Sequence, residues 1–344
     1  MASPKGSFLP FSQQLRLKQL GPNEWTTTHH PQKLGNPLNI AYGGYAIATA
    51  CKAACLSISA IGPKYHLYSL LGNYLGPAYT DRPIHASVRT IRQTRTFATR
   101  QVEISQTQAS GEKRVCLIAI ADFQVAEPKT LMAFDKKPTK TYSRWQNCPT
   151  QTEAYQTLVD AGKVDQKLVD SHSRGFNLLQ EMYDLRPCPE GIFAQNLYGV
   201  AKTLPHTQDN LESSERTTAD WFRLREKLDT AVDHVTNLAF FIDSAIAFLP
   251  LSFNHLWFED SGAVSSLDFA LRVFQNWKEG SGEDYDSKGI DMNKWLLREM
   301  CSTVAGKGRS YGESWIWDEE GKAVACMSQQ SILRPPPAQA KGML

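Results

Sequence analysis

The sequence has few of the features that mark nucleic-acid-binding, secreted or metal-binding proteins. Its 344 residues carry 37 basic and 35 acidic side chains, and the basic residues are dispersed without forming a stripe. Because a nucleic-acid binder usually concentrates positive charge on one face, we expect a small-molecule partner and no nucleic acid. Seven cysteines without a Cys-x-x-Cys pair fit reduced thiols in the cytoplasm better than a disulfide framework or a zinc site.

Long hydrophobic runs and targeting signals are also missing. The longest apolar run, residues 238–249, is shorter than the roughly 20 residues of a membrane-spanning helix, so we expect no membrane span. The N-terminal Met-Ala-Ser-Pro-Lys-Gly lacks the apolar core of a secretory signal, and the C-terminal Lys-Gly-Met-Leu is not the Ser-Lys-Leu peroxisomal signal. We predict a cytoplasmic protein, with a degenerate peroxisomal address left open.

The main organisational signal is a pattern that occurs twice, which favours two domains in a chain of this length. In each copy a helical pattern precedes four strand-like segments. The first copy has its helix from Tyr42-Gly43-Gly44 to Ser59 and strands near 65–75, 83–94, 97–107 and 113–124. The second has its helix from about Thr230 to Leu249 and strands near 262–272, 295–305, 308–318 and 322–333.

The last two strands of the copies can be aligned, which indicates an internal duplication. Arg95-Thr96-Phe97, Gly111 and a run from Val115 correspond to Arg309-Ser310-Tyr311, Gly321 and a run from Val324. We therefore predict four parts: an N-terminal domain at 1–126, a linker with short helices at 127–180, a C-terminal domain at 181–334, and a disordered tail at 335–344. The linker is charged and rich in proline, so we expect it to pack loosely on the surface.

One carboxylate stands out, because Asp243 lies inside the apolar run that Pro250 closes. A buried carboxylate costs several kcal/mol unless it is hydrogen-bonded or protonated, so a functional role is expected. The alternative is an ordinary amphipathic helix in which Asn237, Asp243 and Ser244 share a solvated edge. Partners for a functional Asp243 have to come from elsewhere in the fold.

A long helix wrapped by an antiparallel sheet, present twice, is the outline of an α+β double hotdog fold, and the residues resemble the acyl-CoA thioesterase II family. The N-terminal resemblance comprises Tyr42-Gly43-Gly44, residues 69–77, Asp81-Arg82-Pro83-Ile84 and residues 95–100. The C-terminal resemblance comprises Asp243, Phe248-Leu249-Pro250, residues 265–268, Trp295-Leu296-Leu297 and residues 325–334. It covers most of the chain outside the linker and a stretch near 200–217.

The resemblance implies a hydrolytic triad of Asp243, Ser266 and Gln329, without a metal or other cofactor. Direct hydrolysis of a thioester needs a water molecule aimed at the carbonyl carbon and a base that accepts its proton. Asp243 would be the base, while Ser266 and Gln329 would hold the water or orient the carboxylate. Backbone N–H groups near a helix N-terminus would stabilise the oxyanion.

Each partner of Asp243 has a structural alternative, since Ser266 can be a strand-edge serine and Gln329 an exposed strand residue. The duplication argues for function in the second half. Aligning Val115 with Val324 puts Ile120 at the position of Gln329, and the first helical region, residues 38–62, contains no Asp or Glu. We therefore predict a catalytic C-terminal half and a scaffolding N-terminal half.

Candidate substrate-binding residues are Tyr42, Gly43, Gly44 and Tyr68. The two glycines allow either close backbone approach to a ligand or to the other half, or a tight start of the helix, and we favour the second. The chain differs from the family pattern at three places. It has Tyr68-Ser69 where the family usually has His-Ser, Gly76-Pro77-Ala78 where it has Arg-Pro-Gly, and Asp268-Phe269 where it has Asp-His. Because the arginine at position 76 is missing, the sequence leaves open whether the thiol of the substrate is coenzyme A.

Three other motifs do not support a different chemistry. Gly308-Arg309-Ser310-Tyr311-Gly312 fits a nucleophile elbow, but a strand pattern follows it and the last histidine is His255. Gly306-Lys307-Gly308 has the wrong spacing for a dinucleotide loop, which argues against a redox cofactor. His29-His30 lacks a nearby acidic or cysteine cluster, so we predict no metal site.

The predicted function is hydrolysis of an acyl thioester, with acyl-CoA as the first candidate and fatty-acid metabolism as the context. The alternative is a specialised enzyme of the same fold that isomerises, cyclises or dehydrates an apolar small molecule. A non-catalytic acyl carrier is disfavoured, because a binder gains nothing from a desolvated carboxylate. Hotdog folds pair between protomers in related proteins, so a homo-oligomer is also an open prediction.

Overall fold

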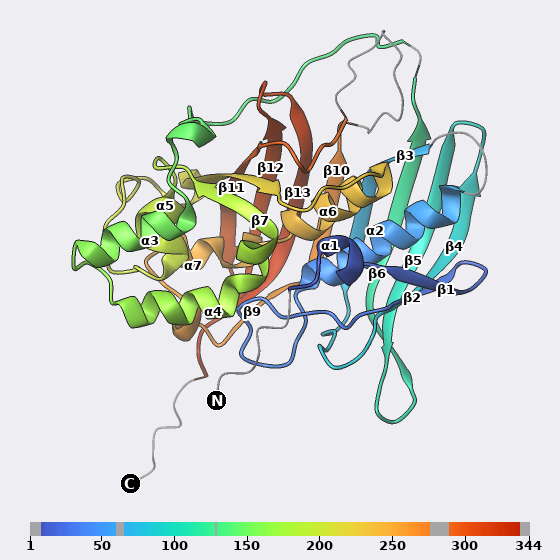
Figure 1. Ribbon diagram of the computed structural model, residues 1–344, viewed down its shortest axis with the longest axis horizontal. Helices are drawn as coiled ribbons and strands as arrows, with labels where there is room; N and C mark the ends of the chain where they lie inside the picture. Colours follow the sequence, from blue (N-terminus) through green and yellow to red (C-terminus); the bar gives the residue numbers. More distant parts are fainter. Residues whose placement is uncertain (1–7, 60–64, 128, 276–288, 338–344) are drawn as a thin grey trace.

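In the computed structural model, which describes residues 8–59, 65–127, 129–275 and 289–337, a single antiparallel sheet wraps around two helices (Figure 1). Thirteen strands of the described residues run in the order β1-β2-β4-β5-β6-β3-β10-β13-β12-β11-β8-β7, with β9 beside β13. The first six strands in this order come from the N-terminal half and the others from the C-terminal half. Strands β3 and β10 pair at the junction.

The N-terminal half consists of helix α2, Gly43–Ser59, and the strands that curve around it. These strands are β1 Leu17–Gly21, β2 Glu24–Thr27, β3 Tyr65–Tyr74, β4 His85–Gln93, β5 Phe97–Thr107 and β6 Lys113–Val125, and a short helix, α1, spans Phe11–Gln14. Strand β5 alternates between buried and half-buried residues because one face of the sheet packs against α2.

The C-terminal half repeats this plan around α6, Ala231–Ile242, whose first turn is capped by the Thr230 side chain. Its strands are β7 Tyr183–Pro187, β8 Thr217–Leu224, β9 Ala263–Ser266, β10 Asp268–Val273, β11 Leu296–Gly306, β12 Arg309–Asp318 and β13 Ala323–Arg334. The two halves form the expected α+β double hotdog.

The helix predicted from Thr230 to Leu249 is wrong at its C-terminal end. Helix α6 stops at Ile242, and Ala245 has a φ of +80°, a left-handed conformation that no helix continues through. A short 3₁₀ helix, η4 Ile246–Phe248, and a short helix, α7 Leu249–Phe253, follow. Asp243 therefore lies at the end of a helix and not in its middle.

The strands predicted in both copies are confirmed to within a few residues, except that the first strand of the second copy is divided into β9 and β10. Strands β1, β2, β7 and β8 were not predicted. They lie at the two ends of the sheet and have no counterpart in the repeated pattern that guided the prediction.

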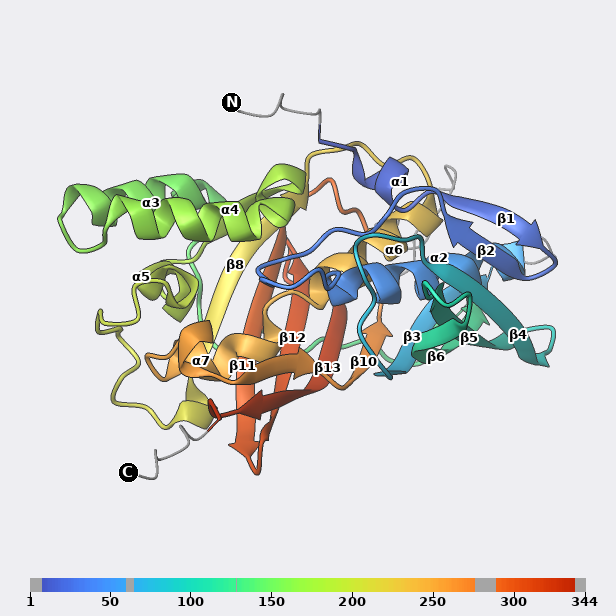
Figure 2. The ribbon, with the colours of Figure 1, turned by 90° about the horizontal axis from the view of Figure 1, so that it is seen from below.

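The expectation that residues 127–180 pack loosely is wrong. Helices α3, Gln151–Asp160, and α4, Gln166–Met182, lie against the outer side of the C-terminal half (Figures 1 and 2). Tyr142 and Cys148 are buried in a core cluster with Trp221 and Trp317.

The remaining short helices are η1 Trp145–Asn147, α5 Ile192–Asn196, η2 Leu197–Gly199, η3 Ser213–Glu215 and η5 Phe258–Asp260. The domain boundaries stay predictions, and most of the tail lies outside the described residues.

Helices α2 and α6 pack antiparallel in very close contact. A Cβ atom on Gly44 would lie 2.5 Å from the carbonyl oxygen of Phe240, and the Tyr42 hydroxyl donates to that carbonyl at 2.7 Å. Gly44 thus permits the close packing of α2 against the other half, which agrees with the preferred interpretation of tight helix entry and packing. At the opposite end of the pair, the Lys52 ammonium contacts the Asp233 carboxylate at 2.8 Å.

The segment Ala231–Phe253 is, by length and composition, apolar enough to cross a membrane, which corrects our statement that no apolar stretch is long enough. Of its apolar window, 83% is buried inside the protein, as in a core helix. Its hydrophobicity is explained by its position between the two curved parts of the sheet.

Candidate active site

Asp243 lies directly after the last residue of α6 and is 6% exposed. Its Oδ1 atom accepts a hydrogen bond from Gln329 Nε2 at 2.8 Å. The Tyr74 hydroxyl donates to the same oxygen at 3.4 Å. Three elements therefore meet at one carboxylate: α6 and β13 from the C-terminal half and β3 from the N-terminal half.

The protonation behaviour of Asp243 follows from this environment. Burial raises the pKa of Asp243 to about 6, and the hydrogen bonds from Gln329 and Tyr74 act in the opposite direction. Burial, together with the nearby Asp243 charge, raises the pKa of Tyr74 well above its ordinary value, so Tyr74 stays a neutral donor. At neutral pH the carboxylate is ionised but is a stronger base than an exposed aspartate, as general-base catalysis requires.

The start of α2 faces the second oxygen of the carboxylate. A Cβ atom on Gly43 would lie 3.0 Å from Asp243 Oδ2 and 2.7 Å from the Tyr74 hydroxyl, so a larger residue does not fit without displacing them. The first N–H groups of a helix have no intrahelical acceptor and carry partial positive charge. The 17-residue helix α2 thus presents backbone donors beside the base, where they can bind a developing oxyanion.

Only one of the two polar side-chain atoms of Gln329 has a hydrogen-bond partner among the described residues. Its Nε2 donates to Asp243, whereas its Oε1 is buried and has no hydrogen-bond partner among the described residues. Buried acceptors are normally paired, so an unpaired one beside a carboxylate suggests a water or ligand position. An N–H or O–H group located there can donate to Oε1.

Ser266 lies near this pair without touching it. It stands opposite Ser331 in the antiparallel β9–β13 register, and Gln329 is two residues further along β13. Directly opposed residues share a sheet face, and a diagonal pair lies about 7–8 Å apart. Within the described residues, Ser266 makes no hydrogen bond to Asp243 or Gln329. The separation is suited to a water molecule between the two side chains.

The sequence alignment that equated Ile120 with Gln329 pairs residues of opposite sheet faces. In β6 the buried residues alternate through Leu117, Ala119, Ala121 and Phe123, and Ile120 belongs to the half-buried series. In β13 Gln329 belongs to the buried series. The buried series of this part of β6 is apolar, so the N-terminal half has no polar group comparable to Gln329 there.

The candidate substrate-binding residues divide into two groups. Gly43 and Gly44 lie at the start of α2, and the Tyr42 hydroxyl is held by α6, so these residues frame the site. Tyr68 is 37% exposed and contacts the Phe97 ring on the N-terminal half. Six strand residues separate it from Tyr74, about 20 Å, so the structure does not bring Tyr68 to Asp243.

A buried ion pair that the sequence analysis missed holds the backbone after Asp243. The Arg298 guanidinium contacts the Asp220 carboxylate at 2.6 Å and donates to the Ser244 hydroxyl at 2.6 Å and the Ser244 carbonyl at 3.2 Å. It therefore fixes the turn in which Ala245 adopts its left-handed conformation. Tyr74 was also missed, because a tyrosine at the end of a strand gives no local signal of its partner.

A cavity begins immediately beyond this turn. It has a volume of about 50 Å³, and Ser244 and Ala245 form part of its wall. Most of the wall is apolar and aromatic, with contributions from Phe176 and Leu179 of α4 and from Phe248. Such a wall suits an apolar group of a substrate.

Comparison of the sequence with known families covers both halves. Residues 31–124 match the acyl-CoA thioesterase N-terminal domain, and residues 183–333 match the acyl-CoA thioesterase C-terminal domain. The chain belongs to the acyl-CoA thioesterase family. This membership makes the protein a thioester hydrolase by class. No curated protein sequence matches the chain.

Solved structures agree with the fold of this thioesterase. Acyl-CoA thioesterase II TesB2 from Mycobacterium marinum superposes with a TM-score of 0.65 at 22% identity, covering 95% of this chain and 99% of that one. A hot dog fold protein of unknown function from Alicyclobacillus acidocaldarius gives 0.63 at 16% identity, with 95% and 98% coverage. A tesB protein from Mycobacterium avium subs paratuberculosis gives 0.62 at 14%, with 94% and 97% coverage.

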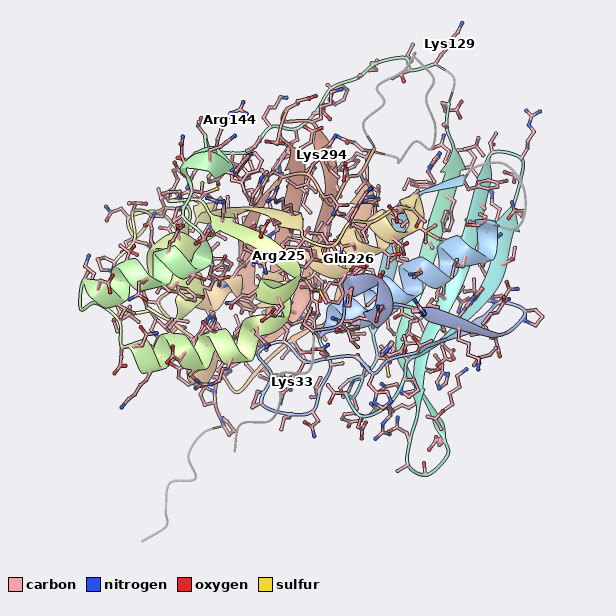
Figure 3. All side chains as sticks on the ribbon, in the orientation of Figure 1. Lys33, Lys129, Arg144, Arg225, Glu226 and Lys294 are labelled. Carbon is pink, nitrogen blue, oxygen red and sulfur yellow. The ribbon has the colours of Figure 1, made fainter. Side chains whose placement is uncertain are left out.

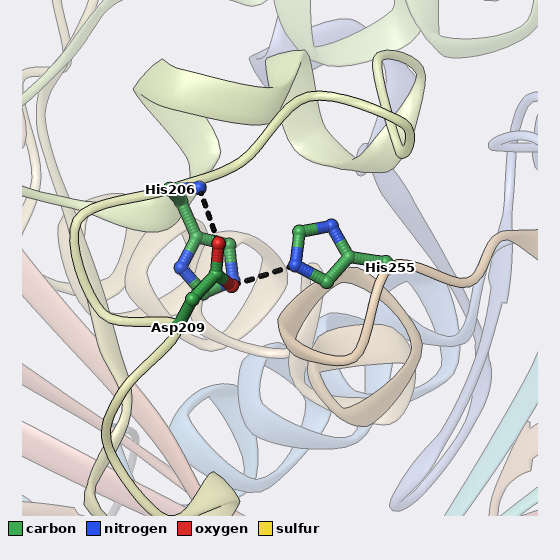
Figure 4. A group of neighbouring side chains, drawn as sticks. All are labelled: His206, Asp209 and His255. Atoms are coloured by element: carbon green, nitrogen blue, oxygen red, sulfur yellow. Dashed lines mark hydrogen bonds and ion pairs between the residues drawn. The ribbon is translucent and has the colours of Figure 1, made fainter.

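The thioesterase also contains a His–Asp–His group that the sequence analysis did not consider. His206, Asp209 and His255 place one ligand atom each within 4.8 Å of one another (Figure 4). Asp209 Oδ1 lies 2.6 Å from His255 Nε2 and 3.1 Å from His206 Nε2. However, His206 Nδ1 accepts from the Gln208 N–H, so His206 Nε2 carries a proton and offers no lone pair to a metal. The arrangement is that of a hydrogen-bonded cluster.

Proposed function

We propose that this thioesterase hydrolyses its substrate by direct attack of a water molecule that Asp243 deprotonates. The observation that carries the proposal is the environment of the buried Asp243. Its pKa is raised to about 6, it accepts a hydrogen bond from Gln329, and its second carboxylate oxygen faces the start of α2. Gln329 Oε1 and the Ser266 hydroxyl are the groups available to hold the attacking water. A metal or redox cofactor is not required by this scheme.

In the first step the water oxygen attacks the thioester carbonyl carbon and Asp243 accepts a water proton. The carbonyl oxygen becomes an oxyanion, and the N–H groups at Gly43 and Gly44 are positioned to stabilise it. Collapse of the tetrahedral intermediate breaks the carbon–sulfur bond. Protonated Asp243 then returns its proton to the leaving thiolate, which gives a free acid and a free thiol.

The substrate class in this proposal is an acyl-CoA with an apolar acyl group. The family match supports the thioester, and the aromatic cavity beside Ser244 supports an apolar group near the base. The cytoplasmic location, the role in fatty-acid metabolism and a homo-oligomeric state remain part of the proposal as predicted from the sequence.

The test is release of free thiol from a panel of acyl-CoAs, short to long, by wild type, Asp243→Asn and Asp122→Asn. Asp122 is a carboxylate of the N-terminal half that accepts a hydrogen bond from the Thr99 hydroxyl, so Asp122→Asn is the matched control. We expect Asp243→Asn to lose more than about a hundredfold in rate and Asp122→Asn to keep it. Wild-type turnover by folded Asp243→Asn would refute the base assignment. No thiol release by folded wild type would favour the isomerase, cyclase or dehydratase alternative.

A further inference from the structure

A second pocket, which the catalytic proposal does not use, lies at the edge of the C-terminal half. It has a volume of about 260 Å³ and combines two tryptophans, Trp145 and Trp295, with three arginines, Arg186, Arg223 and Arg225. We call it the Arg–Trp pocket. Among the described residues that line it, Asp184 is the sole acidic side chain.

The arginines leave the Arg–Trp pocket positively charged. Asp184 binds two of them through its two oxygens, with Arg223 Nε and Arg225 Nε each at 2.8 Å. Arg186 donates to the Cys148 carbonyl at 2.7 Å and has no carboxylate partner among the described residues. One carboxylate thus faces three guanidiniums, whose remaining N–H groups can bind phosphate oxygens in the bidentate geometry that arginine favours.

The tryptophans add a flat aromatic surface and an unused donor. Trp145 and Trp295 stack at 4.8 Å with 18° between their planes, and the Arg223 guanidinium lies 4.7 Å from the Trp295 ring. Trp295 is 5% exposed, yet its Nε1–H has no acceptor among the described residues. A buried indole N–H normally finds an acceptor, so its absence points to a ligand oxygen at this position.

The Arg–Trp pocket adjoins the cavity beside Asp243. Gln151, Gln180 and Leu185 line both spaces, and the cavity reaches Ser244 at its other end. Gln151 Oε1 is buried without a hydrogen-bond partner among the described residues. A ligand in the Arg–Trp pocket can therefore also contact the mouth of this cavity, where Gln151 and Gln180 offer polar groups.

We propose that the Arg–Trp pocket binds the phosphorylated adenosine end of coenzyme A. The nucleotide supplies phosphates for the arginines and a base that stacks on the exposed part of Trp145. This inference rests on the proposed function, and it answers the question raised by the missing arginine at position 76. Figure 3 labels Arg225, one of the arginines that line the pocket, over the C-terminal half.

The experiment measures binding of adenosine 3′,5′-bisphosphate and of coenzyme A by calorimetry, together with hydrolysis of acyl-CoA and of the matching acyl-pantetheine thioester, which lacks the nucleotide. Arg223→Gln removes one guanidinium from the pocket. Thr152→Glu adds a negative charge at the pocket wall, at an exposed site in the first turn of α3 where an acidic residue suits the helix. The matched controls are Arg89→Gln on the distant strand β4 and Gln166→Glu in the first turn of α4.

We expect Arg223→Gln and Thr152→Glu to raise the Kd of both ligands and the KM for acyl-CoA about tenfold, with kcat nearly unchanged. Their hydrolysis of acyl-pantetheine should match wild type, as should all measurements on the two controls. Asp243→Asn should bind coenzyme A as wild type does. Binding should also weaken as salt concentration rises.

The outcomes separate this inference from the proposed function. Hydrolysis of acyl-CoA with equal KM in Arg223→Gln, Thr152→Glu and the controls would overturn the nucleotide site and leave the thioesterase intact. Tight binding of coenzyme A that Thr152→Glu weakens, in a protein that hydrolyses no thioester, would support the site and refute the proposed reaction.

Discussion

The two ends of the α2–α6 helix pair are equivalent by fold and different in chemistry. At one end the start of α2 meets the end of α6, and Asp243 contacts Gln329 and Tyr74. At the other end the start of α6 meets the end of α2 around a cavity of about 60 Å³. The described residues that line this second cavity include Cys55, Phe123 and Val273 and no Asp or Glu.

The comparison shows that the duplicated fold supplies the pocket and that a few side chains supply the chemistry. An antiparallel pair of helices inside a curved sheet creates two similar spaces. One of them acquired a carboxylate with two donors, and the other is lined mainly by apolar side chains. Desolvation raises the pKa of a carboxylate in such a space, so the residue choice at one position decides whether the space can hold a base.

A second difference concerns the backbone. Helix α2 continues without a break to Ser59, whereas α6 ends at Ile242 in a turn fixed by the buried Arg298–Asp220 pair. The turn directs Asp243 toward β3 and α2 and opens the aromatic cavity on its other side. The Asp243 end therefore contains a fully buried charge network, whereas the ion pair at the other end, Lys52–Asp233, is partly exposed.

The largest expected effect comes from exchanging the chemistry of the two ends. Asp243→Asn should lower kcat/KM by more than about a hundredfold. Adding Cys55→Asp to that variant should not restore activity, because a carboxylate at position 55 lacks the contacts with Gln329 and Tyr74 that Asp243 makes. Thiol release by the single and double variants, with folding checked by circular dichroism, tests this. Recovery in the double variant would show that any buried carboxylate in this fold suffices.

A smaller loss is expected when the close approach of the two halves is disturbed. Gly43→Ala places a methyl group 2.7 Å from the Tyr74 hydroxyl and 3.0 Å from Asp243 Oδ2, so both must shift. We expect kcat to fall about 10- to 100-fold. Gly306→Ala is the control, because its added methyl group meets nothing within 4 Å. Equal rates for the two variants would argue against catalysis at the start of α2.

The pH dependence of kcat/KM should report the raised pKa of Asp243. Because burial raises the pKa of Asp243 to about 6, kcat/KM should fall as the pH drops through 6 and the base becomes protonated. Tyr74→Phe removes a hydrogen bond that lowers this pKa, so the midpoint should move to higher pH. A midpoint near that of an ordinary exposed aspartate would contradict a desolvated base.

The same raised pKa affects stability. The folded state keeps the Asp243 proton up to about pH 6, whereas an aspartate in the unfolded chain loses it near its ordinary pKa of 3.8. The wild type should therefore lose stability relative to Asp243→Asn as the pH rises from 4 to 6, by at most about 3 kcal/mol. Denaturant unfolding of both proteins at pH 4 and pH 8 measures the difference, and a constant difference would contradict burial of the charge.

The smallest effect is expected at Ser266, which makes no direct contact with Asp243 or Gln329. If it holds the attacking water, Ser266→Ala should lower kcat about three- to tenfold. Ser265→Ala is the control, since Ser265 is the exposed neighbour on the opposite face of β9. Equal kcat values for the two variants would remove Ser266 from the triad, with Tyr74 as the remaining hydroxyl at the site.

The sequence by itself determined much of the local structure and one half of the site. The repeated helix-and-strand pattern located α2 and the strands that wrap it, because burial on one side imposes a period that is visible in a short window. Asp243 was recognisable because a lone charge in an apolar run is costly wherever the run is buried. The family resemblance added Gln329, whose contact with Asp243 spans 86 residues.

Only the tertiary structure decided which groups surround that carboxylate. Tyr74 is 169 residues from Asp243, and its contact exists because β3 pairs with β10 across the junction of the two halves. The break after Ile242, the face on which Ile120 lies and the assembly of the Arg–Trp pocket depend likewise on register and on packing between distant segments. Such contacts leave no periodic pattern in the chain, because each is fixed by the relative position of whole elements and not by neighbouring residues.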